Sequence, residues 1–218
     1  MVKKLYRIKA LTSHTPGRNI IGLTGGMGSG KTSVAAYLQT SLAIKFINAD
    51  IVSRNLLLPE SQGWKALYAT FGNRYFTGNN FVDTLRLRKD IFTDSDIRQR
   101  INILLHPIIK EAIFSEISES VAAGISVIIV EVPLLFEAGW QDDFDAVVTV
   151  YANQAVCLAR LMARDRCTKS EAQMMIDVQF PSAAKALLAD HVIDNSGPWA
   201  ATYWQLLRLS KIIAGSFS

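Results

Sequence analysis

The chain has 218 residues, of which 50% are hydrophobic and 19% are charged, and its formal net charge is +4 at pH 7. This composition excludes an intrinsically disordered chain, and the length suffices for one domain with a substantial core. The 23 Lys and Arg residues are scattered rather than gathered in a run. They favour a site for phosphorylated small molecules over nucleic-acid binding, so we expect no nucleic-acid partner.

Several features bear on the compartment. The two cysteines form neither a zinc motif nor a disulfide framework. The most apolar stretch is interrupted by Glu131 and Pro133 and is too short to span a bilayer. Residues 1–18 are basic and lack the apolar region of a secretory signal. We therefore expect a cytoplasmic protein without a membrane partner, with an N-terminal extension over residues 1–18 and a single domain over residues 19–218.

Short apolar runs alternate with segments of helical periodicity along the chain, and several runs are nearly unbroken, as in strands covered on both faces. The predicted strands are 19–23, 44–48, 126–132, 146–150 and 191–193, and the clearest predicted helices are 31–39, 96–122, 154–164, 170–179 and 199–214. This order predicts an α/β fold with a five-stranded parallel sheet flanked by helices.

Two connections are longer than a crossover requires. The first predicts a helical insert over about residues 51–122 that binds a substrate. The second is a helical hairpin over about residues 153–181, which separates the last two strands and predicts a mobile lid.

Residues Gly25–Thr32 match G-x-x-x-x-G-K-[ST] between a predicted strand and a predicted amphipathic helix. Glycines let backbone N–H groups surround phosphate oxygens, and the helix adds its positive N-terminal end. We therefore predict ATP and Mg²⁺ as cofactors, with Lys31 on the β and γ phosphates and the Thr32 hydroxyl on Mg²⁺. The residues predicted to hold the nucleotide are Gly26, Gly28, Ser29, Gly30, Lys31, Thr32 and Ser33. The alternative is a plain glycine turn before a helix.

Other users of such a loop fit less well. A GTPase carries an N-K-x-D segment, and the chain has no Asn-Lys pair. A motor ends a strand in a carboxylate pair, whereas Glu131 stands alone as either a magnesium-shell residue or a polar strand end. A small-molecule kinase is the remaining class.

The wider motif order resembles the dephospho-CoA kinase family, from about Ile20 to Gly197. Its landmarks are Leu23–Gly26, Ala49-Asp50 with Arg54, Leu105–Pro107, Val132–Glu137, Arg160–Asp165, Gln179, Lys185, Ala189-Asp190 and Val192–Gly197. The resemblance implies a P-loop kinase fold and ATP-dependent phosphorylation of the ribose 3′-hydroxyl of dephospho-CoA, the last step of coenzyme A biosynthesis. Another nucleoside or nucleotide kinase, or a nucleotide-binding regulator without phosphotransfer, stays open. We expect a monomer or weak oligomer.

The resemblance also implies roles on the acceptor side. Asp50 would accept or orient the 3′-hydroxyl proton, or else be the N-cap of a helix starting at Ile51. Arg54, one helical turn on, would grip a substrate phosphate, or else pair with Asp50. His106 would line the acceptor pocket, or else pack beside a helix break at Pro107. Further acceptor contacts are expected from Pro133, Leu134, Phe136 and Glu137, although the apolar ones could be core.

In the predicted lid, Arg160 and Arg164 share one helix face and would reach the triphosphate as catalytic residues. The alternative is a solvated basic face beside Asp165. Asn195 belongs to a turn that resembles the loop lying against adenine. The chain departs from the family at Asn48, where many members carry Asp, and at Thr84, where many carry an Arg that Arg86 or Arg88 could replace.

Overall fold

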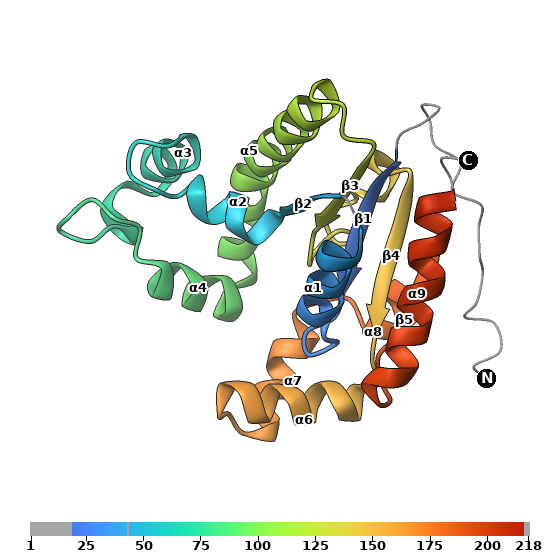
Figure 1. Ribbon diagram of the computed structural model, residues 1–218. Coiled ribbons are helices and arrows are strands. Elements are labelled where there is room, and N and C mark those ends of the chain that lie inside the picture. Colours follow the sequence, from blue (N-terminus) through green and yellow to red (C-terminus); the bar gives the residue numbers. More distant parts are fainter. Residues whose placement is uncertain (1–18, 43, 216–218) are drawn as a thin grey trace. The chain divides into compact units, whose positions relative to one another are not determined.

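The computed structural model describes residues 19–42 and 44–215, so the predicted extension over residues 1–18 lies outside it (Figure 1). Its strands are β1 (Asn19–Gly25), β2 (Lys45–Asn48), β3 (Val127–Glu131), β4 (Ala146–Tyr151) and β5 (His191–Asp194). The sheet order is β2-β3-β1-β4-β5, and β1 pairs in parallel with β3 and β4, as β4 does with β5. The predicted α/β fold with a five-stranded parallel sheet is confirmed.

The helices are α1 (Lys31–Ser41), α2 (Ala49–Asn55), α3 (Gln62–Phe71), α4 (Thr84–Thr93), α5 (Ser95–Ala122), α6 (Gln154–Asp165), α7 (Lys169–Asp177), α8 (Ser182–Leu188) and α9 (Trp199–Gly215). Short 3₁₀ turns cover Gly72–Tyr75 and Gln141–Asp143. Hydrophobic periodicity predicted α1, α5, α6, α7 and α9 with ends that fall within two residues of those observed. It did not predict α8, and it gave α2, α3 and α4 only as parts of a helical insert.

The described residues form two units. The core unit comprises those up to Phe46 and from Ser120 onwards, and the insert unit comprises Ile47–Glu119.

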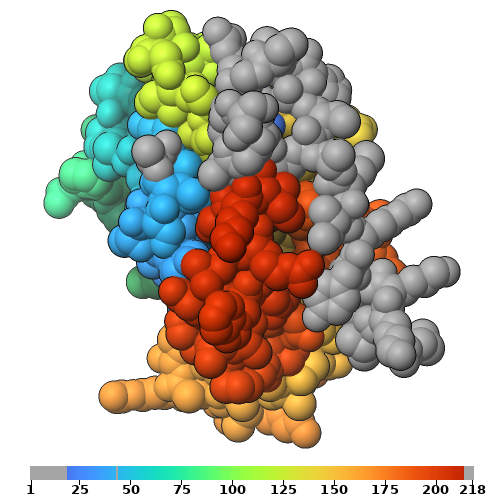
Figure 2. Space-filling view, turned by 45° about the vertical axis from the view of Figure 1, so that its right-hand side comes forward, coloured from blue at the N-terminus to red at the C-terminus, as the bar shows by residue number. Residues whose placement is uncertain are grey.

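One face of the sheet in the core unit packs against α1 and α9. Alternate strand residues such as Ile21 and Leu23 of β1 meet Val34 and Leu38 of α1 in a single buried cluster. Leu206, Leu209 and Ile213 of α9 complete this cluster. Figure 2 shows the other side of α9, in red, on the surface of the core unit. The two-residue alternation of the strands thus places α1, which follows the phosphate loop, against the sheet.

The opposite face of the sheet carries α8 and the turn after β3. Gly22 lies here because a Cβ atom at this position would come within 2.6 Å of Leu135 Cδ1. The Thr149 hydroxyl of β4 donates to the carbonyl oxygen of Lys185 in α8, at 3.3 Å. This bond ties α8 to the centre of the sheet.

The insert unit has its own core, formed by Leu67, Tyr75, Leu87, Ile97, Ile101 and Leu105. Beside it, Asp90 accepts hydrogen bonds from Arg74 at 2.7 Å and from the Tyr75 hydroxyl at 2.9 Å. Both hydrogen bonds lower the pKa of Asp90, and the one from Arg74 has the larger effect. A separate hydrophobic core allows this unit to hold its own shape.

The predicted alternative of a helix break at Pro107 is wrong, because α5 continues through it from Ser95 to Ala122. An interior proline costs roughly 3 kcal/mol through its missing N–H and its clash with the preceding turn. Leu105 and Ile109, on either side of Pro107, pack in the core of the insert unit and offset this cost. Within the described ranges, no helix is long and apolar enough to cross a membrane.

Candidate functional site

The phosphate loop joins the end of β1 to α1 through backbone that only glycine adopts easily. Gly28 and Gly30 have φ angles of 74° and 89°. A Cβ atom at Gly30 would lie 2.2 Å from Asn195 Nδ2, and one at Gly28 would lie 2.6 Å from the carbonyl oxygen of Cys157. Conformation and lack of space therefore both require glycine at these two positions.

The start of α1 suits an anion. Gly30 is the N-cap, and the first turn contains no acidic residue, so no side-chain charge there competes for the positive end of the helix. Thr32 and Ser33 are exposed in this turn. The Lys31 ammonium group donates to the carbonyl oxygens of Gly25 at 2.8 Å and Gly26 at 3.1 Å. All predicted phosphate-binding residues therefore lie in one loop and one helical turn.

Asn195, which follows β5, forms a hydrogen bond to the backbone of the phosphate loop. Its side chain is buried, its Nδ2 donates to the Ser29 carbonyl oxygen at 2.7 Å, and its Oδ1 accepts from the Thr202 hydroxyl at 2.9 Å. The contact explains why Gly30 has no room for a side chain. The sequence assigned Asn195 to the adenine loop and did not reveal this second contact.

Arg160 of α6 holds the same loop. Its Nη1 lies 3.3 Å from the carbonyl oxygens of both Gly28 and Ser29, and its Nη2 donates to the carbonyl oxygen of Asn195 at 2.9 Å. The guanidinium group thereby compensates the negative ends of these peptide dipoles.

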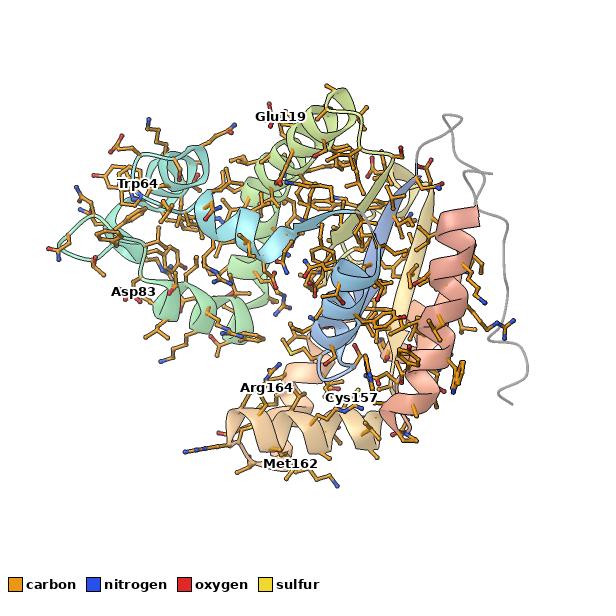
Figure 3. All side chains as sticks on the ribbon, viewed as in Figure 1. Trp64, Asp83, Glu119, Cys157, Met162 and Arg164 are labelled. Carbon is orange, nitrogen blue, oxygen red and sulfur yellow. The ribbon has the colours of Figure 1, made fainter. Side chains whose placement is uncertain are left out.

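Arg164, one turn further along α6, behaves differently. It forms two hydrogen bonds of 2.7 Å to the Asp165 carboxylate, and 65% of its side chain is exposed. The hydrogen bond to Asp165 raises the pKa of Arg164. Figure 3 shows Arg164 on α6 with Cys157 and Met162. The alternative prediction of a solvated basic face therefore holds for Arg164 and is wrong for Arg160.

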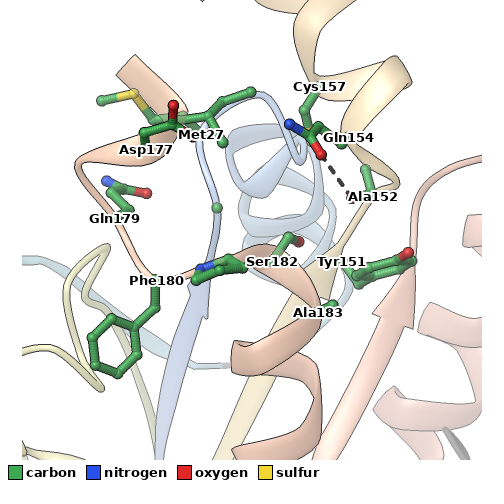
Figure 4. Close-up of a pocket in the computed structure, with 13 residues that line it drawn as sticks. Met27, Tyr151, Ala152, Gln154, Cys157, Asp177, Gln179, Phe180, Ser182 and Ala183 are labelled. Carbon is green, nitrogen blue, oxygen red and sulfur yellow. Dashed lines mark hydrogen bonds between the residues drawn. The ribbon is translucent and has the colours of Figure 1, made fainter. Parts of the chain in front are cut away.

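A pocket of about 440 Å³ opens beside the loop within the core unit (Figure 4). Three segments line it. They are Gly26 and Met27 of the loop, then Tyr151, Ala152, Gln154 and Cys157 from the end of β4 to the start of α6, and Ile176, Asp177 and residues 179–183 around the link from α7 to α8. Burial raises the pKa of the Cys157 thiol and keeps it protonated at neutral pH. Gln179 Oε1 and Ser182 Oγ are buried and have no hydrogen-bond partner among the described residues. A polar ligand could supply both missing bonds.

The turn after β3 contains four of the predicted acceptor contacts. Phe136 is buried in the core, whereas Pro133 and Leu134 are half-buried. Glu137 Oε1 accepts from Lys185 Nζ at 2.8 Å and from the backbone N–H of Phe180 at 2.9 Å. Sequence reasoning placed Lys185 in a landmark but gave it no role. Its signal was a lone lysine among the apolar residues of the segment 183–188.

In the insert unit, Asp50 is not the N-cap of α2, so that alternative is wrong. The cap is Asn48, whose Oδ1 accepts from the backbone N–H of Asp50 at 2.9 Å and of Ile51 at 3.1 Å. Asn and Asp are about equally good N-caps, so Asn48 supplies the cap that an Asp would. The Asp50 carboxylate is left exposed on the first turn of the helix.

The alternative of an ion pair between Arg54 and Asp50 is also wrong. Both side chains are described and exposed, and no ion pair joins them. The guanidinium group of Arg54 lies on an exposed residue of α2.

His106 is half-buried in α5, and burial lowers its pKa, so the imidazole is neutral at pH 7.

Thr84, the second departure from the family pattern, is the first residue of α4. The N-cap of this helix is Asp83, whose Oδ1 accepts from the backbone N–H of Arg86 at 3.0 Å. Arg88 lies over the ring of Phe92, 5.7 Å from its centroid.

The described residues contain no group of three or more His, Cys, Asp or Glu side chains arranged to hold a metal ion by themselves. The Thr32 hydroxyl is exposed in the first turn of α1, and Glu131 is buried at the end of β3. This sparse set fits Mg²⁺, which usually takes one or two protein ligands together with substrate phosphates.

Comparisons with known proteins agree with this geometry. The sequence model of the dephospho-CoA kinase family matches residues 19–200. The chain is 39% identical to a dephospho-CoA kinase of Oryza sativa subsp. japonica over 82% of this chain and 77% of that one. It is 34% identical to a dephospho-CoA kinase of Geobacillus kaustophilus over 88% of this chain and 94% of that one.

The fold is similar to that of a solved dephospho-CoA kinase from Campylobacter jejuni, with a TM-score of 0.65 at 21% identity. The similarity covers 92% of this chain and all of that one. The family model over residues 19–200 and the relatives at 39% and 34% identity lead to one conclusion: the chain belongs to the dephospho-CoA kinase family.

Proposed function

We propose that the chain transfers the γ-phosphoryl group of ATP to the ribose 3′-hydroxyl of dephospho-CoA and releases ADP and coenzyme A. The observation that carries this proposal is the phosphate loop, whose carbonyl oxygens are held by Lys31, Arg160 and Asn195. A preformed cradle lowers the cost of ordering the donor. Membership of the family supports the choice of acceptor.

On the donor side, the residues proposed to hold the phosphates are Gly26, Gly28, Ser29, Gly30, Lys31, Thr32 and Ser33. Lys31 exchanges the carbonyl oxygens of Gly25 and Gly26 for β- and γ-phosphate oxygens. Mg²⁺, when bound, neutralises phosphate charge, with Thr32 as its protein ligand and Glu131 as a second candidate. Asn195 supports the donor through the carbonyl of Ser29.

On the acceptor side, Asp50 orients the 3′-hydroxyl and accepts its proton as the new P–O bond forms and the bond to ADP breaks. The transition state is loose, so position matters more than a strong base, and an ordinary carboxylate suffices. Arg54 binds a phosphate of dephospho-CoA. His106, Pro133, Leu134, Phe136 and Glu137 are the remaining proposed contacts, some of them through packing.

The segment of about residues 153–181 is proposed as the lid, and about residues 51–122 as the acceptor-binding insert. Arg164 would leave Asp165 for the triphosphate when the lid closes, whereas Arg160 already holds the loop. Such closure places positive charge on the donor only when both substrates are present. We place the reaction in the cytoplasm and expect a monomer or weak oligomer without nucleic-acid or membrane partners.

A panel of acceptors tests this function. Purified protein with ATP and Mg²⁺ is expected to convert dephospho-CoA to coenzyme A, while nucleosides and nucleoside monophosphates are left unchanged. Preferential transfer to one of those compounds would identify another kinase. ATP binding without transfer to any acceptor would identify a regulator.

A further inference from the structure

Lys185 is a fully buried lysine that the proposed mechanism does not use. Its side chain is 0% exposed, although lysine is almost never fully buried unless it is paired. Its ammonium group donates to Glu137 Oε1 at 2.8 Å and to the carbonyl oxygen of Pro133 at 2.7 Å. Both partners lie in the turn after β3.

The two acceptors are shared with other segments. The Pro133 carbonyl oxygen also accepts from the Thr24 hydroxyl at 3.2 Å, and Thr24 directly precedes the phosphate loop. Glu137 Oε1 also accepts from the N–H of Phe180, which lines the pocket. We call Thr24, Pro133, Glu137, Phe180 and Lys185 the lysine hub. It joins the stem of the loop, the turn after β3 and the rim of the pocket.

A buried ion pair is weak evidence for a purely stabilising role. Burial lowers the pKa of Lys185 and Glu137 opposes this, so desolvation of the ammonium group is the larger effect. Buried ion pairs are often no more stabilising than apolar residues of similar volume. Unlike apolar packing, hydrogen bonds depend on distance and angle. The Lys185 ammonium group therefore fixes the positions of two oxygen atoms of the turn after β3.

We propose that Lys185 is a positioning residue for phosphoryl transfer, which holds the turn Pro133–Glu137 and the pocket rim in register with the start of the phosphate loop. The inference rests on the proposed function, in which this turn contacts the acceptor. A displacement of about 1 Å between reacting groups can cost about a hundredfold in rate. The hub lies entirely within the core unit, beside the loop that holds the donor.

The first test removes the charges. Lys185→Met leaves the Glu137 carboxylate buried without its cation and is expected to lower the melting temperature. Lys185→Met/Glu137→Gln removes both charges, keeps an acceptor for Phe180, and is expected to recover most of that loss. Both variants are expected to raise the KM for dephospho-CoA and to lower kcat, each about tenfold, with the Kd of ATP within about twofold of wild type. A double variant with recovered stability, normal KM and normal kcat would overturn the proposal.

The second test uses a milder pair of variants, which stays informative if charge removal prevents folding. Thr24→Val removes only one hydrogen bond to Pro133 and is expected to raise the KM for dephospho-CoA about threefold. Thr149→Val is the matched control, because Thr149 is equally buried in a strand and its hydroxyl donates to the backbone carbonyl oxygen of Lys185, not to the turn after β3. Equal KM values for dephospho-CoA in the two variants would show that the hydrogen bond from Thr24 to Pro133 does not help to position the turn.

A third variant separates this inference from the proposed function. Leu134→Ala alters a half-buried residue of the turn that does not belong to the hub. If it leaves the KM for dephospho-CoA unchanged, the acceptor role of the turn fails, and the inference fails with it. If it raises that KM while the Lys185 variants do not, only the inference fails.

Discussion

The two units hold their proposed functional side chains in opposite ways. In the core unit, Lys31, Arg160 and Asn195 each make hydrogen bonds of 2.7 to 3.3 Å to the phosphate loop. In the insert unit, the side chains of Asp50 and Arg54 are exposed, and the two do not form an ion pair. The donor side is therefore held by hydrogen bonds within the core unit, whereas the two side chains proposed for the acceptor side are exposed on their helix. Variants on the two sides should consequently differ in which kinetic constant they change.

Lys31→Ala is expected to have the largest effect, a fall in kcat of about a thousandfold together with weaker ATP binding. The reason is the loss of the only lysine of the loop, whose charge would oppose that of the β and γ phosphates. Coupled ADP release and isothermal titration with ATP measure the two quantities. Lys211→Ala, at an exposed position of α9, is the control. Near-normal kcat in Lys31→Ala would contradict the assignment of the donor site.

Asp50→Asn is expected to lower kcat about a hundredfold while leaving the Kd of ATP unchanged. The amide keeps the shape and position of the side chain but cannot accept the proton of the acceptor. Steady-state rates with dephospho-CoA give kcat, and Asp142→Asn is an exposed control. Weaker ATP binding in Asp50→Asn would break the contrast between the units.

Asn195→Asp is expected to raise the KM for ATP about tenfold with little change in the KM for dephospho-CoA. A carboxylate oxygen would replace the Nδ2 donor and face the Ser29 carbonyl oxygen at 2.7 Å, which turns a hydrogen bond into a repulsion. Initial rates over a matrix of both substrates separate the two constants, and Asn73→Asp serves as an exposed control. Equal changes in both KM values would show a general structural defect instead.

The smallest expected effect concerns acid stability. Burial lowers the pKa of His106 in the insert unit and of His191 in the core unit. Between the folded pKa and the unfolded value of about 6.5, the unfolded chain binds more protons, so the free energy of unfolding falls as the pH drops. His106→Gln is expected to make this fall shallower without abolishing it, because His191 remains.

Urea unfolding at several values between pH 5 and pH 7.5 measures this slope. A slope identical to that of wild type would mean that His106 is equally solvated in the folded and unfolded chains. In that case, burial in the insert unit would have no effect on its protonation.

Local patterns were sufficient for most of the architecture. The strands are short apolar runs and α1, α5, α6, α7 and α9 have clear periodicity, so their positions follow from nearby residues. Helix α8 was missed because it has only seven residues, too few for a periodic pattern. Pro107 left a helix break open as an alternative to the predicted helix 96–122, since a proline usually marks a boundary, and packing in the insert unit offsets its cost.

The site divides along the same line. Residues 25–32 could be recognised because phosphate binding needs glycine, lysine and a hydroxyl at fixed spacing within one short segment. The contacts of Asn195 and Arg160 could not, because their partners lie 166 and 132 positions away along the chain. Asn48 was taken as the loss of a carboxylate, and its role as a helix cap became visible only in the backbone geometry.

The sequence by itself therefore determined the parallel α/β fold, the phosphate loop and the family, since each depends on the order and spacing of residues along the chain. Only the tertiary structure decided what Lys185 and Glu137 do. A lysine and a glutamate separated by 48 positions carry no local pattern that pairs them. Folding α8 against the sheet buries the ammonium group, and burial makes a paired carboxylate and a backbone carbonyl necessary.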